Sequence, residues 1–202
     1  MSDVSDVQLR KAELRAQVLA RRSALPADQR TAAGRLIRDA VLAAPQVQMA
    51  GTIAAYYSVG TEPDTRGLVY ALWKRGSYVL LPLLRPDGDL DWASYEGPDS
   101  LVAGPRGLRE PGEPPRGVDA VARADVVLVP ALAVDRRGVR LGRGAGFYDR
   151  TLDLAAPDAR LVAVVRDSEV VDELPEDPHD RRVGWALTPG HGPVRLGITA
   201  EE

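Results

Sequence analysis

The segment from Arg140 to Arg150 holds the residues of this chain best suited to chemistry. Its charged and flexible members are Arg140, Gly142, Arg143, Gly144, Gly146 and Asp149. Alternating glycines let a backbone turn tightly and approach a ligand closely, and successive amides at a helix start bind anions. Arginine binds phosphate through paired hydrogen bonds, and an aspartate in the first helical turn is placed to hold a cation beside it. We therefore predict a phosphate-binding loop, with a glycine-rich turn capped by Asp149 as the alternative.

The loop differs from two common nucleotide-binding motifs. The sequence contains no Gly-Lys-Ser/Thr, which excludes a Walker loop. Phe147 stands where the dinucleotide-binding fingerprint requires its third glycine. A phosphate site in this segment is therefore of another type.

A second candidate lies between Tyr57 and Asp64, directly after an apolar run that we expect to form a strand. Ligands of open α/β sheets gather at the carboxyl ends of strands, so Glu62 is placed to accept a hydrogen bond from a ligand N–H group. The alternative is a helix N-terminus, where acids favour the helix dipole, and Asp64 fits that alternative better.

A third candidate is the tripeptide Pro178-His179-Asp180. Asp180 is placed to share a cation with Asp149, because Mg²⁺ takes oxygen ligands and keeps several waters, so that two carboxylates suffice. A surface turn is the alternative. His179 has no serine or cysteine nucleophile motif to serve, so a hydrolase triad is not supported.

Hydrophobic patterning predicts helices and strands in alternation. The expected helices cover residues 4–22, 26–43, 65–75 and 147–154. The expected strands cover residues 52–57, 78–83, 90–95, 125–130, 161–165, 183–187 and 194–198. We expect Pro82 to end the second strand and Asp64 to cap the third helix. The stretch 97–117, rich in Gly and Pro, is expected to be a long irregular segment with a functional role.

This alternation predicts a single α/β domain over residues 1–202, with a mainly parallel sheet and helices on both faces. The helices over residues 4–43 are expected to pack on the sheet as an N-terminal arm.

Composition narrows the classes of function. The 202 residues contain no cysteine, which excludes cysteine catalysis, cysteine metal ligation and disulfides. The net charge of −3 gives no electrostatic case for nucleic-acid binding. No run reaches the roughly 18–20 apolar residues of a membrane span, and charges throughout Met1 to Arg22 argue against a secretion signal. We expect a cytoplasmic monomer that acts on small molecules.

Seven segments in one order resemble the 5-formyltetrahydrofolate cyclo-ligase family, also called 5,10-methenyltetrahydrofolate synthetases. They are Lys11-x-x-Leu14-Arg15, Tyr57…Glu62-x-Asp64-Thr65, Leu81-Pro82, Gly107-Leu108-Arg109-Glu110-Pro111, Pro130 to Asp135 with Gly138, Arg140 to Arg150, and Pro175…Pro178-His179-Asp180. The resemblance covers roughly residues 9–190.

The resemblance implies a three-layer α/β/α sandwich, related to ribose-phosphate isomerases and CoA-transferases, and assigns roles to residues. It implies an ATP site formed by Lys11, Arg15, Arg140, Leu141, Gly142, Arg143, Gly144, Ala145, Gly146, Phe147 and Tyr148. It implies a folate site formed by Tyr57, Glu62, Arg143, Gly144, Ala145, Gly146 and Phe147, with Glu62 bonded to the pterin ring. It implies that Asp149 and Asp180 hold Mg²⁺. We expect Lys11, Arg143 and Tyr148 to take part in catalysis.

The implied reaction is the ATP-dependent cyclisation of 5-formyltetrahydrofolate to 5,10-methenyltetrahydrofolate, with ADP and phosphate released. ATP phosphorylates the formyl oxygen, and N10 then attacks the activated carbon. Phosphoryl transfer needs positioning and charge neutralisation rather than a protein nucleophile, which suits a chain without cysteine. Ala145 departs from the family pattern, since many members carry Lys or Gly there. A non-catalytic relative that binds folate or nucleotide is the alternative.

Overall fold

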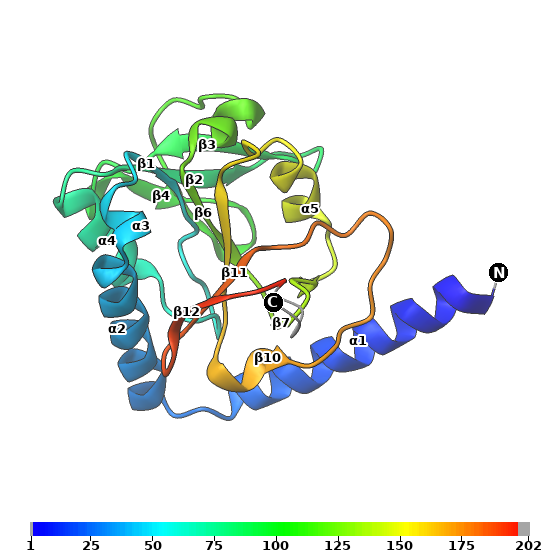
Figure 1. Cartoon of the computed structure of the whole chain (residues 1–202). Helices are drawn as coiled ribbons and strands as arrows, with labels where there is room; N and C mark the ends of the chain where they lie inside the picture. The colour runs from blue at the N-terminus through cyan, green and yellow to red at the C-terminus, as the bar shows by residue number, and fades with distance from the viewer. Residues whose placement is uncertain (1, 198–202) are drawn as a thin grey trace.

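A seven-stranded sheet forms the centre of the computed structural model, which describes residues 2–197 (Figure 1). Its strands are β1 (Thr52–Ala54), β2 (Tyr78–Leu84), β3 (Leu90–Ser94), β6 (Val126–Pro130), β9 (Arg160–Val164), β11 (Trp185–Thr188) and β12 (Gly192–Arg195). Their order is β12-β11-β9-β6-β1-β2-β3. The central strands are parallel, and the edge strands β3 and β12 are antiparallel to their neighbours. The predicted mainly parallel α/β sheet is confirmed.

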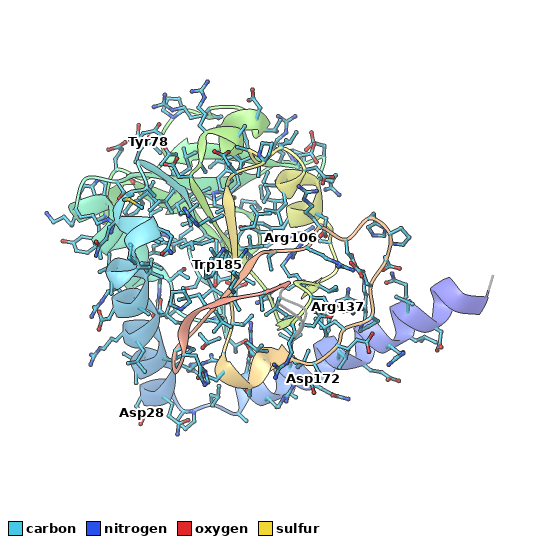
Figure 2. The ribbon with its side chains drawn as sticks, in the orientation of Figure 1. Asp28, Tyr78, Arg106, Arg137, Asp172 and Trp185 are labelled. Carbon is cyan, nitrogen blue, oxygen red and sulfur yellow. The ribbon has the colours of Figure 1, made fainter. Side chains whose placement is uncertain are left out.

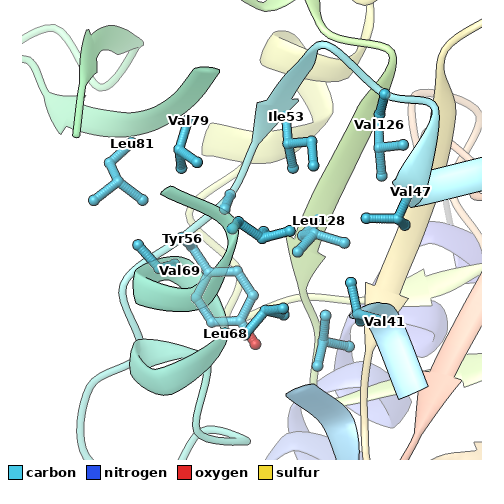
Figure 3. Packing of buried hydrophobic residues seen from close by; sticks show 14 of the residues in the cluster. Val41, Val47, Ile53, Tyr56, Leu68, Val69, Val79, Leu81, Val126 and Leu128 are labelled. Carbon is cyan, nitrogen blue, oxygen red and sulfur yellow. The ribbon is translucent and has the colours of Figure 1, made fainter. Parts of the chain in front are cut away.

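Helices cover both faces of this sheet, as predicted. Their bounds are α1 (Ser2–Ser23), α2 (Ala27–Ala43), α3 (Pro45–Gln48), α4 (Arg66–Lys74) and α5 (Phe147–Leu152), with 3-10 helices η1 (Pro98–Ser100), η2 (Pro105–Gly107), η3 (Val118–Arg123) and η4 (Asp167–Glu169). The core under α2 and α4 takes Val126 and Leu128 from β6 (Figure 3). The core under α5 and η3 takes Val127 and Val129 from the same strand. Because successive strand residues face opposite sides, one apolar run supplies both cores.

Helix α1 packs on a smaller sheet rather than on the main one. This second sheet has the order β10-β7-β8, formed by β7 (Ala133–Asp135), β8 (Arg140–Leu141) and β10 (Val170–Val171). Val18 of α1 is buried with Leu132 and Leu141 at this sheet. The first half of α1 extends beyond the body of the protein in Figure 1. Of the expected arm, α2 therefore packs on the main sheet and α1 on its smaller neighbour.

A buried ion pair fixes the carboxyl-terminal end of α1. The Arg22 guanidinium donates two hydrogen bonds of 2.7 Å to the Glu169 carboxylate and one to the carbonyl of Ala131, which follows β6. Both side chains are almost fully buried. Removing one partner of such a pair costs about 3–5 kcal/mol, because the other charge is left buried and unpaired. These bonds hold α1 against the end of the central strand.

Several predicted element boundaries were wrong. Pro82 lies inside β2, where it pairs with Trp92 of β3. The pairing of β1 with β2 ends at Leu80, so β1 does not require a backbone N–H from Pro82, and the proline is tolerated within the strand. Thr65 rather than Asp64 holds the N-cap position of α4, while Asp64 binds the Arg66 side chain.

The segment 97–117 is more regular than predicted. It contains an antiparallel pair formed by β4 (Leu101–Ala103) and β5 (Arg109–Pro111). Ile198, at the end of the last predicted strand, lies outside the described residues. Among those residues, no helix combines the length and apolar character needed to cross a bilayer.

The chain reverses its direction of travel across the sheet between β1 and β6. From β1 it passes through α4 to β2, and from β6 it passes through α5 to β9 on the other side. Helices of the two crossovers lie on opposite faces. Such a switch point leaves a crevice at the carboxyl ends of the strands, where ligands bind in α/β proteins.

Candidate active site

A cavity of about 490 Å³ lies at this switch point. Residues that follow β1 and β6 and residues in the last part of β2 line it, together with one side of α1, the loop before α5 and the segment near residue 180. Every residue that the sequence assigned to a site lies in this lining: Lys11, Arg15, Tyr57, Glu62, Arg140 to Asp149, and Asp180. The structure therefore brings together residues separated by up to about 170 positions, although their individual roles stay predictions.

The glycine-rich loop forms one wall of the cavity. Gly144 and Gly146 have φ angles of +98° and +69°, which L-residues with a side chain rarely adopt. The Gly142 carbonyl accepts a hydrogen bond of 3.0 Å from Nε of Arg15, so α1 and the loop are joined directly. Gly146 occupies the N-cap position of α5. The sequence placed this loop correctly between a strand and a helix, although the strand is the two-residue β8.

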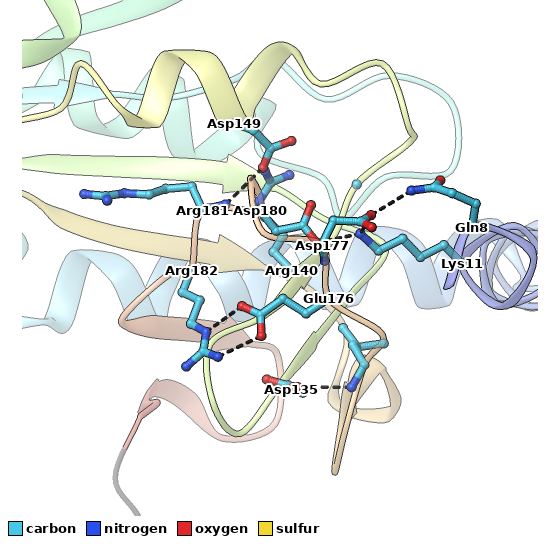
Figure 4. Close-up of polar contacts among 12 residues, drawn as sticks. Gln8, Lys11, Asp135, Arg140, Asp149, Glu176, Asp177, Asp180, Arg181 and Arg182 are labelled. Carbon is cyan, nitrogen blue, oxygen red and sulfur yellow. Dashed lines mark hydrogen bonds and ion pairs between the residues drawn. The ribbon is translucent and has the colours of Figure 1, made fainter. Parts of the chain in front are cut away.

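Lys11 lies beside two aspartates in the cavity lining, Asp177 and Asp180 (Figure 4). Its Nζ is 2.6 Å from Asp177 and 2.5 Å from Asp180, and its side chain is only 5% exposed. Burial lowers the pKa of Lys11, but the hydrogen bonds to Asp177 and Asp180 outweigh burial and raise that pKa above 10.5. The lysine is therefore a fixed positive charge rather than a general base.

Asp149 is also paired with a cationic side chain. Its Oδ1 is 2.6 Å from the guanidinium of Arg140, which is buried at β8, and it accepts a longer bond of 3.4 Å from the Arg181 N–H. That N–H belongs to the residue next to Asp180, so the two predicted metal ligands lie on neighbouring parts of the cavity (Figure 4). Each is held by a cationic side chain.

Asp180 forms a group with two further potential metal ligands. The ligand atoms of Asp177, His179 and Asp180 lie within 4.8 Å of one another. Hard cations such as Mg²⁺ prefer oxygen ligands, and the two carboxylates already hold a positive charge in the ammonium of Lys11. The donors present therefore fit a divalent cation, with Asp177 as a ligand that the sequence did not indicate.

Glu62 lies on the side of the cavity formed by the loop after β1. One carboxylate oxygen is 3.2 Å from the Arg143 guanidinium, and the other accepts the Val59 N–H at 2.9 Å. Tyr57 lines the cavity beside it. The loop after β1 and the glycine-rich loop are therefore in direct contact through Glu62 and Arg143.

Two tyrosines border the same region. Burial raises the pKa of Tyr148 and of Tyr56 well above the usual value of 10, and the nearby Glu62 carboxylate raises both further. Tyr148 therefore stays protonated at neutral pH, so its hydroxyl serves as a hydrogen-bond donor and not as a base.

The rim of the cavity carries an arginine in an unusual conformation. Arg106 has φ +55°, the single positive φ of a non-glycine residue among the described residues. Its guanidinium lies over the Phe147 ring, 5.8 Å from the centroid, near the start of α5 (Figure 2). Leu108, Arg109 and Glu110, which follow Arg106 in the chain, also line the cavity.

Sequence reasoning missed some of the lining residues. Gln8 donates a 2.7 Å hydrogen bond to Asp177, and Tyr56, Asp177 and Glu110 also face the cavity. Asp177 lies three residues before Asp180. Its position close to a suspected metal ligand was the signal in the sequence that could have identified it. Gln8 lies one helical turn before Lys11 and could have been found from the face that Lys11 and Arg15 share.

Comparisons with known proteins decide the family. A sequence profile of the 5-formyltetrahydrofolate cyclo-ligase family matches residues 7–189. The chain belongs to this family. The 5-formyltetrahydrofolate cyclo-ligase of Mycolicibacterium smegmatis is 44% identical over 192 residues, which cover 92% of this chain and 97% of that protein. The cyclo-ligase of Escherichia coli K12 is 35% identical over 172 residues, which cover 84% and 94%.

Solved structures of cyclo-ligase relatives agree. The NMR structure of 5,10-methenyltetrahydrofolate synthetase from Aquifex aeolicus matches with a TM-score of 0.81 and 26% identity, covering 95% of each chain. The synthetase from Mycoplasma pneumoniae, at 20% identity and a TM-score of 0.69, shares the fold. The predicted family and the prediction of an enzyme are confirmed, and the relatives support 5-formyltetrahydrofolate cyclo-ligase activity.

Proposed function

We propose that this chain converts 5-formyltetrahydrofolate to 5,10-methenyltetrahydrofolate with consumption of ATP and with Mg²⁺ as its metal. One observation supports this proposal above the others: Lys11, the glycine-rich loop, Glu62 and Asp180 line a single cavity. A site that joins two substrates needs such a shared space, because holding reactants together supplies much of the rate enhancement.

The triphosphate of ATP binds between α1 and the glycine-rich loop. The backbone amides of Gly142 to Gly146 face it at the start of α5, and Arg15 and Arg143 supply charge from either side. Arg143 is half exposed, so it can leave Glu62 and turn to a phosphate at small cost. These cations also compensate for Ala145, which contributes no charge.

The reaction balances without a protein nucleophile. The formyl oxygen attacks the γ-phosphorus, the bond from phosphorus to the β,γ-bridging oxygen breaks, and ADP leaves. The lone pair of N10 then attacks the formyl carbon, the C–O bond breaks, and inorganic phosphate departs with the former formyl oxygen. N10 loses its proton, and the 5,10-methenyl cation remains. Lys11 and Arg143 stabilise the charge that develops on the transferred phosphoryl group, while Tyr148 donates a hydrogen bond.

Asp149 and Asp180, with Asp177 beside them, are the residues that hold Mg²⁺. When bound, the ion neutralises negative charge on phosphate oxygens. The pairing of Asp180 with Lys11 and of Asp149 with Arg140 holds these carboxylates in place before the ligand arrives. Tyr57 and Glu62 border the folate, with the Glu62 carboxylate accepting an N–H of the pterin ring.

Formation of methenyltetrahydrofolate, followed by its near-ultraviolet absorbance, tests the proposal. The purified chain should produce it from 5-formyltetrahydrofolate only when ATP and Mg²⁺ are both present, and a chelator should stop the reaction. Product formation at the full rate without ATP, or undiminished by the chelator, contradicts the proposal. Binding of both ligands with no turnover identifies the chain as a non-catalytic relative.

A further inference from the structure

Glu110 is a buried acid on the cavity wall for which the reaction described above has no use. It lies in the middle of β5, paired across the hairpin with Val102, and is only 9% exposed. The same cavity lining includes the apolar residues Pro82, Leu84, Leu90 and Leu108, together with Arg106 and Arg109. A carboxylate in such a place is costly unless its charge is paired and hydrogen-bonded.

The partners of Glu110 within the protein are incomplete. Oε1 accepts the Leu84 N–H at 2.9 Å, and this is the one hydrogen bond that the side chain forms within residues 2–197. Within residues 2–197, no lysine, arginine or histidine forms an ion pair with it. The other acids of the cavity differ in this respect, because Glu62, Asp149 and Asp180 each face a basic side chain. Oε2 of Glu110 is left with unused acceptor capacity.

The backbone makes room for this side chain at one position. A Cβ on Gly104 would lie 2.6 Å from Cδ and 2.7 Å from Oε2 of Glu110. Gly104 has φ −99°, which any residue adopts, so conformational freedom does not explain the glycine. Space for the Glu110 carboxylate does explain it.

We propose that Glu110 binds the substrate and accepts hydrogen bonds from the 2-amino and N3–H groups of its aminopyrimidinone ring. This inference rests on the proposed function. The ring of 5-formyltetrahydrofolate presents these two donors side by side at one edge, its flat faces are apolar, and a carboxylate is the acceptor that pairs best with neighbouring N–H donors. The leucines and Pro82 pack on the ring, while Glu62 accepts a different ring N–H from the opposite side of the cavity.

Equilibrium binding of 5-formyltetrahydrofolate and of its 2-desamino analogue to wild type and to Glu110→Gln tests this assignment. The introduced glutamine keeps an oxygen for the Leu84 N–H, so the melting temperature of the variant should equal or exceed that of wild type. The variant should bind 5-formyltetrahydrofolate about 10- to 100-fold more weakly, and it should lose clearly less affinity for the analogue. Its affinity for ATP should be unchanged. Glu96→Gln, at an exposed acid two residues beyond β3, is the matched control and should bind as wild type does.

A second variant reaches the same group without changing its charge. Gly104→Ala pushes the Glu110 carboxylate away from its place, so it should weaken binding of 5-formyltetrahydrofolate and leave ATP binding intact. Equal affinity of wild type and Glu110→Gln for 5-formyltetrahydrofolate, or the same fold loss for both folates, overturns the role of Glu110 alone. Absence of folate binding in wild type overturns the proposed function together with this inference.

Discussion

Replacement of Lys11 by Met should strongly destabilise the protein. The methionine keeps most of the apolar stem but removes the ammonium that lies 2.6 Å from Asp177 and 2.5 Å from Asp180. The three side chains are 5%, 7% and 11% exposed, so solvent replaces little of the lost charge. Removing one partner of a buried ion pair costs about 3–5 kcal/mol, whereas an exposed pair contributes about 0–1 kcal/mol. We expect a loss of about 3–5 kcal/mol in the free energy of unfolding.

Urea unfolding at neutral pH without divalent ions measures this loss. Lys74→Met is the control, since Lys74 is exposed and its ammonium lies 5.3 Å from the centroid of the Trp73 ring and forms no ion pair within residues 2–197. The control should lose under about 1 kcal/mol. Added Mg²⁺ should recover part of the stability of Lys11→Met, because the two carboxylates then hold a different cation.

The pH dependence of the same measurement has a definite sign. The pKa of Lys11 is raised above 10.5 in the folded protein, despite burial, by its bonds to the aspartates. Its contribution is therefore fully present below pH 10.5 and is lost as pH rises through the folded pKa. From neutral pH upward, the difference in the free energy of unfolding between wild type and Lys11→Met should narrow only above about pH 10.5. A loss no larger than that of Lys74→Met at neutral pH refutes the account of the buried cluster.

Three further substitutions address the walls of the cavity. Asp149→Asn should lower turnover at least about 100-fold, the scale of one lost electrostatic contact in a transition state. Because the substitution also leaves the buried Arg140 guanidinium without an anionic partner, the rate is compared at a temperature where circular dichroism shows the variant folded; a rate near wild type excludes Asp149 from the metal site. Glu62→Gln should raise the Kd of 5-formyltetrahydrofolate more than that of ATP in titration calorimetry, and equal changes contradict a pterin contact. Gly144→Ala should weaken ATP binding, because φ is +98° and the new Cβ meets the Arg15 guanidinium at 3.3 Å. Gly60→Ala, also at positive φ but with open space around it, controls for backbone strain and should leave ATP affinity unchanged.

The order and type of the main elements could be predicted because the apolar residues of each run indicate which of its faces are buried. Val126 to Pro130 is apolar throughout, as a strand covered on both faces must be. The short strands β7, β8 and β10 were missed because two or three residues are too few to show a hydrophobic periodicity. Pro82 was misplaced because its effect depends on where β1 ends, which is a property of the neighbouring strand.

The candidate site was predicted mainly through the resemblance to the family. Composition and spacing indicated an anion-binding loop at Gly142 to Gly146, but the convergence of Lys11 with Asp180 depends on how α1 packs on the smaller sheet. Asp177 was not singled out, and Glu110 was named only within a family segment and given no site role, because the local sequence does not distinguish a buried acid from a solvent-exposed one. Their burial arises from residues far away in the chain, such as Lys11 and Leu84.

Isotope transfer tests the central claim most directly. We expect that 5-formyltetrahydrofolate labelled with ¹⁸O in its formyl group, incubated with the chain, ATP and Mg²⁺, yields inorganic phosphate carrying one ¹⁸O for each methenyltetrahydrofolate formed. That result requires the phosphoryl group of ATP and the formyl oxygen to meet in the cavity between α1 and the glycine-rich loop. Methenyltetrahydrofolate accompanied by unlabelled phosphate contradicts direct phosphorylation of the formyl oxygen.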